Sequence, residues 1–256
     1  RRLNWGAARG LGSVAYAVIA CILGILTSRL GNATVPAMIV FCFGGLTACL
    51  TAFPFITGET PGEKAPKGAA TPLAFFQKYS RFAVLLIGAV LIYTGHVVLN
   101  SFTFQIIQSK GGGSGEMGVA AALSACWELP TMFCFAFMVR QIRCDVWIRV
   151  SGFFFTLKAA ASWLAPNIPI FLGVQAFQML GFGLLTVASV HYINLVMHEE
   201  DAIKGQAYFT MTYTLGSVLG SVIGGVMLDR LGVNTLLICS SCVSLAGSLI
   251  LSISTQ

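Results

Sequence analysis

The stretch RFAVLLIGAVLIYTGHVVLNSFTFQ, residues 81–105, decides the fold class. Its single charged residue, Arg81, stands at the start and is followed by a long apolar run. A helix needs about 20 predominantly apolar residues to cross a hydrocarbon core that is about 30 Å thick. We therefore expect this stretch to form a membrane-spanning helix.

Similar apolar runs recur on both sides of this stretch. They cover approximately residues 10–28, 34–55, 117–139, 145–164, 167–196, 204–228 and 232–253. Of all residues, 56% are hydrophobic and 9% are charged, whereas a soluble domain carries about 25% charged residues. The runs are continuous, whereas the strands of a membrane β-barrel alternate in hydrophobicity. The sequence predicts an all-α integral membrane protein with about eight transmembrane helices.

The basic residues predict the orientation of these helices. Most of them fall on one side of the membrane: Arg1, Arg2, Arg9, Lys64, Lys67, Lys78, Arg81, Arg140, Arg143, Arg149 and Lys204. Arg29, Lys110 and Arg230 fall on the other side. Because cytoplasmic loops are enriched in Lys and Arg, we expect both termini to be cytoplasmic, in an inner or plasma membrane. The net charge of +6 then reflects membrane topology, and we expect no nucleic-acid partner.

One composition break and a weak repeat predict the domain organisation. The segment ITGETPGEKAPKGAATP, residues 56–72, is typical of a flexible linker. LGSV recurs at residues 11–14 and 215–218, and SRLGNAT at 28–34 resembles DRLGVNT at 229–235. Such repeats are common in secondary transporters. We expect residues 1–55 to be the last two helices of an N-terminal half-bundle, 56–80 a cytoplasmic linker, and 81–256 a C-terminal half-bundle of six helices. Four further helices would precede the chain.

Two charged residues lie deep inside the predicted spans. Glu128, in ACWELP, is the only acidic residue well inside a span, and Lys158 lies in the middle of FFFTLKAAASW. A charge at the bilayer centre costs about 2.5–3.5 kcal/mol, so such residues usually serve transport or pair with each other. Pro130 also frees the carbonyl of Cys126 near the carboxyl. Glu128 is interpreted as a solute-binding or proton-binding group, or alternatively as a structural partner of Lys158. A pair that forms and breaks would act as a switch.

Uncharged polar residues form two further groups. Tyr93, His96 and Asn100 share one helical face, which predicts that they line a cavity. Gln175 and Gln178 form an i, i+3 pair that would either bind solute hydroxyls or hold helices together. The sequence contains no zinc motif, phosphate-binding loop or catalytic triad. We therefore expect neither an enzyme nor a cofactor.

Small residues predict where helices pack closely. Gly216, Gly220 and Gly224 form a ridge in one predicted helix. A looser ridge in the first helix consists of Ser13, Ala17, Cys21 and Gly24.

Together these features resemble the major facilitator superfamily, and within it the oligosaccharide:proton symporter group that includes lactose permease. The segment AARGLGSVAYA resembles the fifth helix of that group, where an arginine and a sugar-stacking aromatic residue correspond to Arg9 and Tyr16. The group usually has tryptophan at the second position. ACWELP resembles the eighth helix, whose sugar-binding and proton-coupling glutamate corresponds to Glu128. Lys158 stands where the permease has an arginine that helps to deprotonate the carrier.

The resemblance covers helices five to twelve and implies a function. It implies proton-coupled symport of a sugar or similar small polar solute by alternating access, with the proton as coupling ion. The expected partners are the solute and the lipid bilayer, and we expect a monomer. The tenth helix differs, because Gln178 and Gly181 replace a histidine and a glutamate. Coupling then rests on Glu128 alone, or the protein is a uniporter or a drug or metabolite exporter of the same superfamily.

Overall fold

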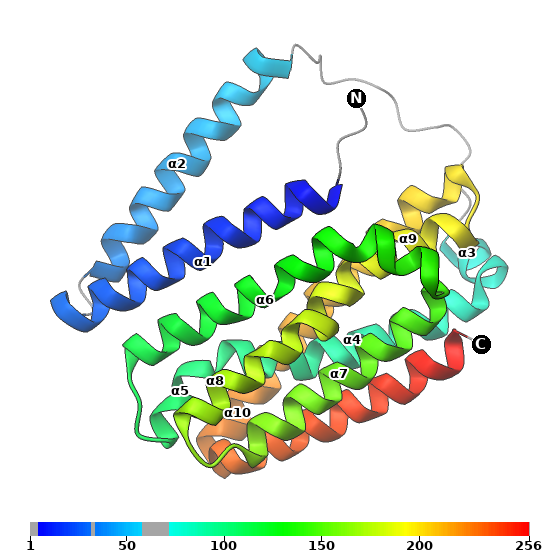
Figure 1. Ribbon diagram of the computed structural model, residues 1–256. Coiled ribbons are helices and arrows are strands. Elements are labelled where there is room, and N and C mark those ends of the chain that lie inside the picture. Colours follow the sequence, from blue (N-terminus) through cyan, green and yellow to red (C-terminus); the bar gives the residue numbers. More distant parts are fainter. Residues whose placement is uncertain (1–4, 32–33, 58–71, 256) are drawn as a thin grey trace.

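The computed structural model describes residues 5–31, 34–57 and 72–255 (Figure 1). These residues form helices joined by short turns, and no strand occurs among them. The bundle begins with α1 (Trp5–Leu30), α2 (Thr34–Thr57), α3 (Pro72–Lys78), α4 (Ser80–Ser101) and α5 (Thr103–Ser109). It continues with α6 (Ser114–Gln141), α7 (Cys144–Leu164), α8 (Ile168–Val174), α9 (Leu184–Val196) and α10 (Glu199–Ser254). The prediction of an all-α membrane protein is confirmed.

Each predicted span falls on a helical segment. Among the described residues, 5 segments are long and apolar enough to cross a membrane: Val35–Ala52, Ser80–Ser101, Ser114–Gln141, Ile168–Val196 and Glu199–Ser254. The last of them is 56 residues long and contains two predicted spans, which meet at Gly232. In α1, the apolar part is the shorter segment Val14–Thr27. Helix α7 has 21 residues and carries Asp145, Arg149 and Lys158.

The break in α10 supports the internal repeat. Gly232 has φ 77° and ψ 175°, and Gly31 has φ 76° at the end of α1. Both glycines follow Arg-Leu in the repeated segments SRLG and DRLG. A positive φ is costly for any residue with a Cβ. The repeat therefore encodes the same glycine turn between two helices at both places.

Helix α4 forms the centre of the bundle, between the two arms of α10. On one side, a Cβ at Gly216 would lie 2.7 Å from Tyr93 Cβ, and one at Gly220 would lie 2.8 Å from Thr94 O. On the other side, Ser240 Oγ donates a hydrogen bond of 2.9 Å to the carbonyl of Gly95. The predicted ridge of Gly216, Gly220 and Gly224 in α10 is confirmed, because these glycines allow the backbones of α10 and α4 to approach closely.

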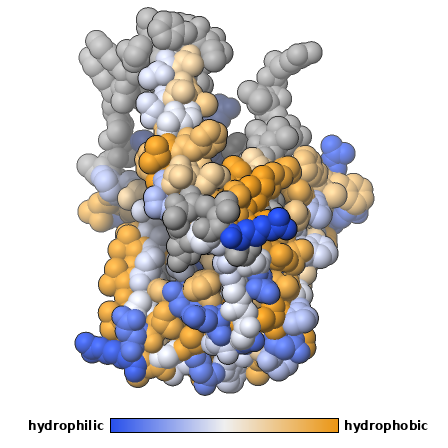
Figure 2. Space-filling view, turned by 90° about the vertical axis from the view of Figure 1, so that its left-hand side faces the viewer, coloured by the Kyte–Doolittle hydropathy of each residue, from blue (hydrophilic) through white to orange (hydrophobic). Residues whose placement is uncertain are grey.

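Helix α1 packs against α6 through a pair of glycines. A Cβ at Gly24 would lie 2.9 Å from Gly118 Cα. The side chains of Ser13, Ala17 and Cys21 lie outside the described residues. Helix α2 extends away from the bundle (Figure 1), and its Val40 and Phe41 are 72% and 75% exposed. The end-on view in Figure 2 shows apolar residues on the flanks and hydrophilic residues among them on the face turned to the viewer.

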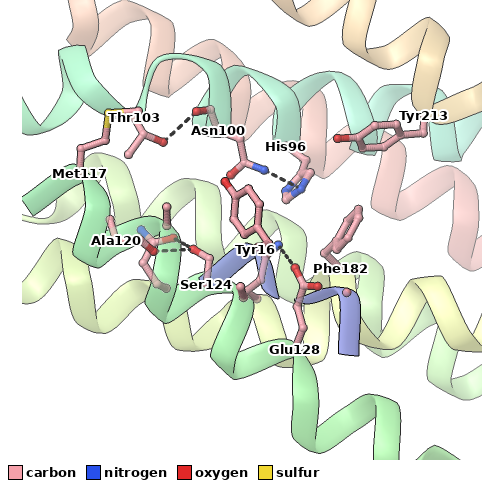
Figure 3. A pocket seen from close by; sticks show the side chains of 15 residues that line it. Tyr16, His96, Asn100, Thr103, Met117, Ala120, Ser124, Glu128, Phe182 and Tyr213 are labelled. Carbon is pink, nitrogen blue, oxygen red and sulfur yellow. Dashed lines mark hydrogen bonds between the residues drawn. The ribbon is translucent and has the colours of Figure 1, made fainter. Parts of the chain in front are cut away.

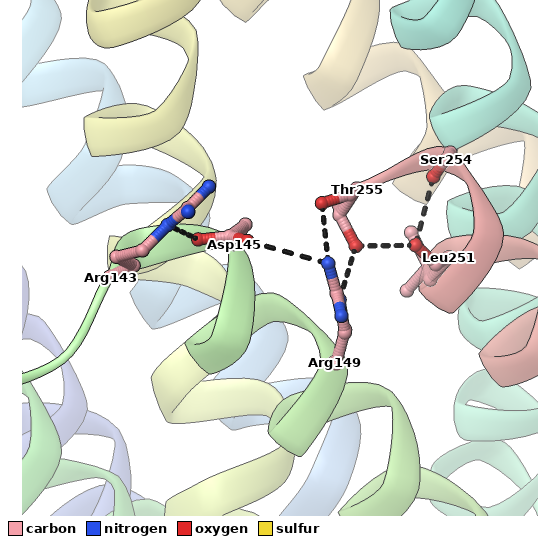
Figure 4. Close-up of polar contacts among 6 residues, drawn as sticks. All are labelled: Arg143, Asp145, Arg149, Leu251, Ser254 and Thr255. Atoms are coloured by element: carbon pink, nitrogen blue, oxygen red, sulfur yellow. Dashed lines mark hydrogen bonds and ion pairs between the residues drawn. The ribbon is translucent and has the colours of Figure 1, made fainter.

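Polar contacts tie the helices together at the end that carries most of the basic residues. Lys78 Nζ lies 2.7 Å from Asp201 Oδ2, and this hydrogen bond raises the pKa of Lys78. Arg149 of α7 donates hydrogen bonds to Thr255 Oγ1 (3.0 Å) and to Thr255 O (2.7 Å) at the end of α10 (Figure 4). Asp145 Oδ2 lies 3.4 Å from Arg149 Nη2. A cation next to the last carbonyls of a helix complements its dipole.

The predicted linker is partly structured. Residues 58–71 lie outside the described residues, whereas Pro72–Lys78 forms α3, inside the range predicted to be linker. Phe75 of α3 is buried against Tyr208 of α10, with ring centroids 5.2 Å apart. The apolar residues of PLAFFQK explain why α3 packs against the bundle. The division into residues 1–55, 56–80 and 81–256 stays a prediction.

We expect Gly220→Ala to destabilise the contact between α4 and α10. The added methyl group would lie 2.8 Å from Thr94 O, so one backbone must shift, at a cost of about 1–3 kcal/mol. Gly225→Ala is the matched control, because its Cβ would meet nothing closer than 4.0 Å. Thermal unfolding in detergent should show a lower midpoint for Gly220→Ala alone. Equal midpoints for the two variants would contradict the described packing.

Candidate functional site

A cavity of about 630 Å³ lies between α1, α4, α6, the segment that follows α8, and α10. Figure 3 shows side chains that line it. The polar lining residues are Tyr16, His96, Asn100, Thr103, Ser124, Glu128, Gln175, Gln178 and Tyr213. Gly12, Met117, Ala120, Ala121, Ala125 and Phe182 complete the lining. A polar cavity of this size inside an apolar bundle is typical of a small-molecule site.

The cavity brings together most of the residues predicted from the sequence. Tyr16 of α1, His96 and Asn100 of α4, Glu128 of α6, and Gln175 and Gln178 of the segment that follows α8 line the same space. Their role in binding a solute stays a prediction. Arg9 belongs to α1, but its side chain lies outside the described residues.

An amide joins the buried acid to the buried base. Lys158 Nζ donates to Gln178 Oε1 at 2.6 Å, and Gln178 Nε2 donates to Glu128 Oε1 at 2.9 Å. All three side chains are buried, with exposed fractions of 3%, 3% and 8% for Lys158, Gln178 and Glu128. The amide turns its oxygen to the ammonium and its NH2 group to the carboxylate, so its dipole complements both charges. A direct pair of Glu128 and Lys158 is one of the alternatives that the sequence leaves open, and the structure places Gln178 between these two residues.

The helix that carries Gln178 is irregular where it passes Glu128. A 3-10 turn, η1 (Gln175–Gln178), is followed by a π turn, η2 (Met179–Gly183). Hydroxyls of neighbouring helices bond to the backbone there: Thr131 Oγ1 donates to Met179 O at 2.8 Å, and Ser151 Oγ donates to Gly181 O at 3.0 Å. Such partners make irregular backbone tolerable inside a membrane.

Glycine explains how closely η2 approaches α6. A Cβ at Gly183 would lie 3.3 Å from the Cα of Glu128. The irregular segment η2 is therefore packed directly against the residue that carries the buried carboxyl group, Glu128. Gly181, the residue at the position where the permease group has a glutamate, lies next to Phe155 of α7.

His96 and Asn100 form a second polar pair in the cavity wall. Asn100 Nδ2 lies 2.9 Å from His96 Nε2 (Figure 3). Since the amide nitrogen is a donor, His96 Nε2 accepts, and the imidazole proton is assigned to Nδ1. The ring stacks on Phe182 with centroids 4.9 Å apart. Among the described residues, His96 Nδ1 has no hydrogen-bond partner.

Gln175 differs from Gln178 in how its amide is used. Ser124 Oγ donates to Gln175 Oε1 at 2.9 Å, and Gln175 Nε2 donates to Phe171 O at 3.2 Å. The amide thus links α6 to α8, which favours the helix-holding interpretation for Gln175. Sequence analysis missed Ser124. It lies four residues before Glu128, on the same face of α6, and this spacing was the available signal.

Two aromatic residues of the cavity were also missed, and one predicted residue lies elsewhere. Phe182 and Tyr213 line the cavity, but in the sequence they resemble any other aromatic residue of an apolar run. Tyr93 was expected to share the cavity with His96 and Asn100. It is 3% exposed, packs against Tyr213 with ring centroids 5.3 Å apart, and lines a neighbouring hollow.

The helix bundle and its polar central cavity define a multi-pass membrane transporter. The model of the MFS_1 like family matches residues 1–238. The chain therefore belongs to this family, which places it in the major facilitator superfamily of secondary transporters. A comparison with curated proteins gives no match.

We expect Lys158→Met to lower the stability of the protein strongly. It leaves the carboxylate of Glu128 and the amide of Gln178 without the buried cation, and breaking such a buried pair costs about 3–5 kcal/mol. The double variant Lys158→Met/Glu128→Gln should regain part of this loss, because both charges are removed. Lys204→Met, near the start of α10, is the control for the loss of one positive charge.

The measurement is the midpoint of thermal unfolding in detergent at neutral pH. A double variant that loses the sum of both single effects would contradict the coupling through Gln178.

Proposed function

We propose that this secondary transporter carries a sugar or a similar small polar solute in symport with protons. The observation that carries the proposal is the position of Glu128, which lines the cavity and is joined through Gln178 to Lys158. An acid that faces both a solute cavity and a buried base is in the right place to bind solute and proton in turn.

The chemistry of the cavity supports a neutral solute with several hydroxyl groups. Hydroxyl, amide and imidazole groups surround the space, and aromatic rings offer apolar faces. Its volume of about 630 Å³ lies within the usual range for small-molecule sites. In the proposed complex, Arg9, Tyr16, His96 and Asn100 bind the solute together with Glu128. The donor on His96 Nδ1 would contribute once a rotation of the ring brings it to the solute.

The proposed cycle couples the solute to a proton through the Glu128 group. Glu128 takes up a proton from outside and binds solute, and the carrier then opens inward by alternating access between its halves. Release of the proton restores the carboxylate, which the Gln178 amide and Lys158 stabilise. Both termini are cytoplasmic in this proposal. The membrane potential supplies about 2.3 kcal/mol per charge per 100 mV.

Uniport or export within the same superfamily is the alternative. Gly181 favours it, because the permease group has a second acid at this position. A carrier with Glu128 as a static structural acid would then move its solute without a proton.

The decisive variant is Glu128→Gln, which removes the ionisable group and keeps the size of the side chain. Proton flux should be recorded in proteoliposomes with the full-length protein and a panel of mono-, di- and trisaccharides and nucleosides. We expect alkalinisation of the medium with a transported solute, and its loss in Glu128→Gln, while exchange of the solute persists.

The matched control is Glu116→Gln. Glu116 lies near the start of the same helix, where its Oε2 accepts a hydrogen bond of 2.9 Å from Gly113 N. This variant should keep proton flux. Unchanged concentrative uptake by Glu128→Gln would contradict the coupling role, and transport without any pH change would favour a uniporter or exporter.

A further inference from the structure

A second hollow of about 420 Å³ adjoins the central cavity. It lies between α4, α9 and the first arm of α10, toward the end of the bundle that holds Lys78 and Asp201. Phe182 and Tyr213 line both hollows. Their ring centroids are 6.0 Å apart, and Figure 3 shows the two rings at one end of the central cavity. The two spaces therefore share an aromatic wall.

The second hollow combines hydroxyl groups with aromatic faces. It is lined by Tyr93, Phe182, Thr186, Ser189, Val190, Ile193, Gln206, Phe209, Thr210 and Tyr213. None of these described residues is an acid or a base of the Asp, Glu, Lys, Arg or His type. A solute that enters this space leaves the ionisable groups of the central cavity behind.

The three serine and threonine hydroxyl groups of this hollow present acceptors. Thr186 Oγ1 donates to Phe182 O at 2.7 Å, and Thr210 Oγ1 donates to Gln206 O at 2.9 Å. Ser189 Oγ donates to Thr186 O at 3.2 Å. Since each proton is already used on a helix carbonyl, the free lone pairs accept hydrogen bonds. Such a set suits a ligand that is rich in O–H donors and has an apolar face for the rings.

The backbone that carries Phe182 is irregular. Phe182 lies inside η2, between the 3-10 turn and the regular helix α9. Conversion of a π turn to α-helix shifts the following residues by one position, which corresponds to about 100° of rotation around the axis. Gly181 and Gly183 flank Phe182, and a Cβ at Gly183 would lie 3.3 Å from Glu128 Cα, so a change of register would occur directly beside Glu128. Such a conversion would turn Phe182 out of the shared wall and would rotate the start of α9 with it.

We propose that the second hollow is a transit site for the transported polyhydroxy solute, and that Phe182 and Tyr213 form a movable partition between this site and the central cavity. The inference rests on the proposed function. The solute would pass the partition first and occupy a neutral site, while the proton remains with Glu128. Release of the solute and release of the proton would then be separate steps.

The partition is tested without any solute. Val190→Cys places a thiol in the second hollow, and a charged, membrane-impermeant methanethiosulfonate is added to either side of proteoliposomes that contain the full-length protein. Mass spectrometry then reports modification at residue 190 separately from the native cysteines. We expect labelling from the Lys78 side, and several-fold more labelling from the opposite side in Phe182→Ala/Tyr213→Ala.

The control for the partition is Tyr213→Phe, which keeps the ring and should label like the parent. Equal labelling from both sides in the parent would overturn the partition. Unchanged one-sided labelling in a double alanine variant that keeps the parent's thermal midpoint would overturn it as well.

The transit site is tested by protection of the same thiol. Each member of the saccharide and nucleoside panel is added during labelling, in the parent and in Glu128→Gln. The solute that drives proton flux should slow modification of residue 190 in both backgrounds. Thr186→Val and Thr210→Val should each raise the half-protecting concentration about three- to tenfold, because each removes one hydrogen-bond acceptor.

Thr156→Val is the matched control, since Thr156 Oγ1 bonds to Gly152 O in α7 and lines neither hollow. It should leave protection unchanged. Proton flux without protection of residue 190 would overturn the transit site and leave the proposed function intact. Absence of both flux and protection for every panel member would overturn both.

Discussion

The hydrogen-bonded chain Lys158–Gln178–Glu128 is the interaction on which the site depends. In hydrocarbon, a buried charge is tolerated only when a partner compensates it, and each of these residues comes from a different part of the bundle. The chain therefore fixes the positions of α7, η1 and α6 relative to one another. The amide that reaches both charges lies at the end of the 3-10 turn η1, directly before the π turn η2.

Close backbone packing supplies the rigid frame around this group. Glycines of α10 let one arm lie directly against α4, and Gly24 and Gly118 bring α1 against α6. Where large polar side chains replace small residues, the helices leave a space, and this space is the central cavity. The same helices thus provide close backbone contacts on one face and line a polar hollow on another, since Gly216 and Gly220 pack against Tyr93 and Thr94 while His96 of α4 lines the cavity.

Two aromatic residues, Phe182 and Tyr213, separate the two hollows and line both of them. His96 stacks on Phe182, and Phe182 lies on the irregular segment that also carries Gln178. Gln178, which bonds to Glu128, and Phe182, which lies between the two hollows, are therefore four residues apart on one helical segment. Ionisable groups such as Glu128 line the central cavity, whereas the described lining of the neighbouring hollow consists of neutral polar groups, aliphatic side chains and aromatic rings.

The sequence by itself determined the fold class, the approximate spans, the glycine ridge and the presence of two charged residues, Glu128 and Lys158, deep inside the spans. These follow from one-dimensional signals: the length of apolar runs, the spacing of small residues and the cost of charge in lipid. Only the tertiary structure decided that Gln178 joins the two charges, that Gln175 accepts a hydrogen bond from Ser124 of α6, and that Tyr93 lies outside the central cavity. It also revealed Ser124, Phe182 and Tyr213 as lining residues. Helical periodicity assigns a residue to a face, but which helix that face meets depends on packing between segments far apart in the chain.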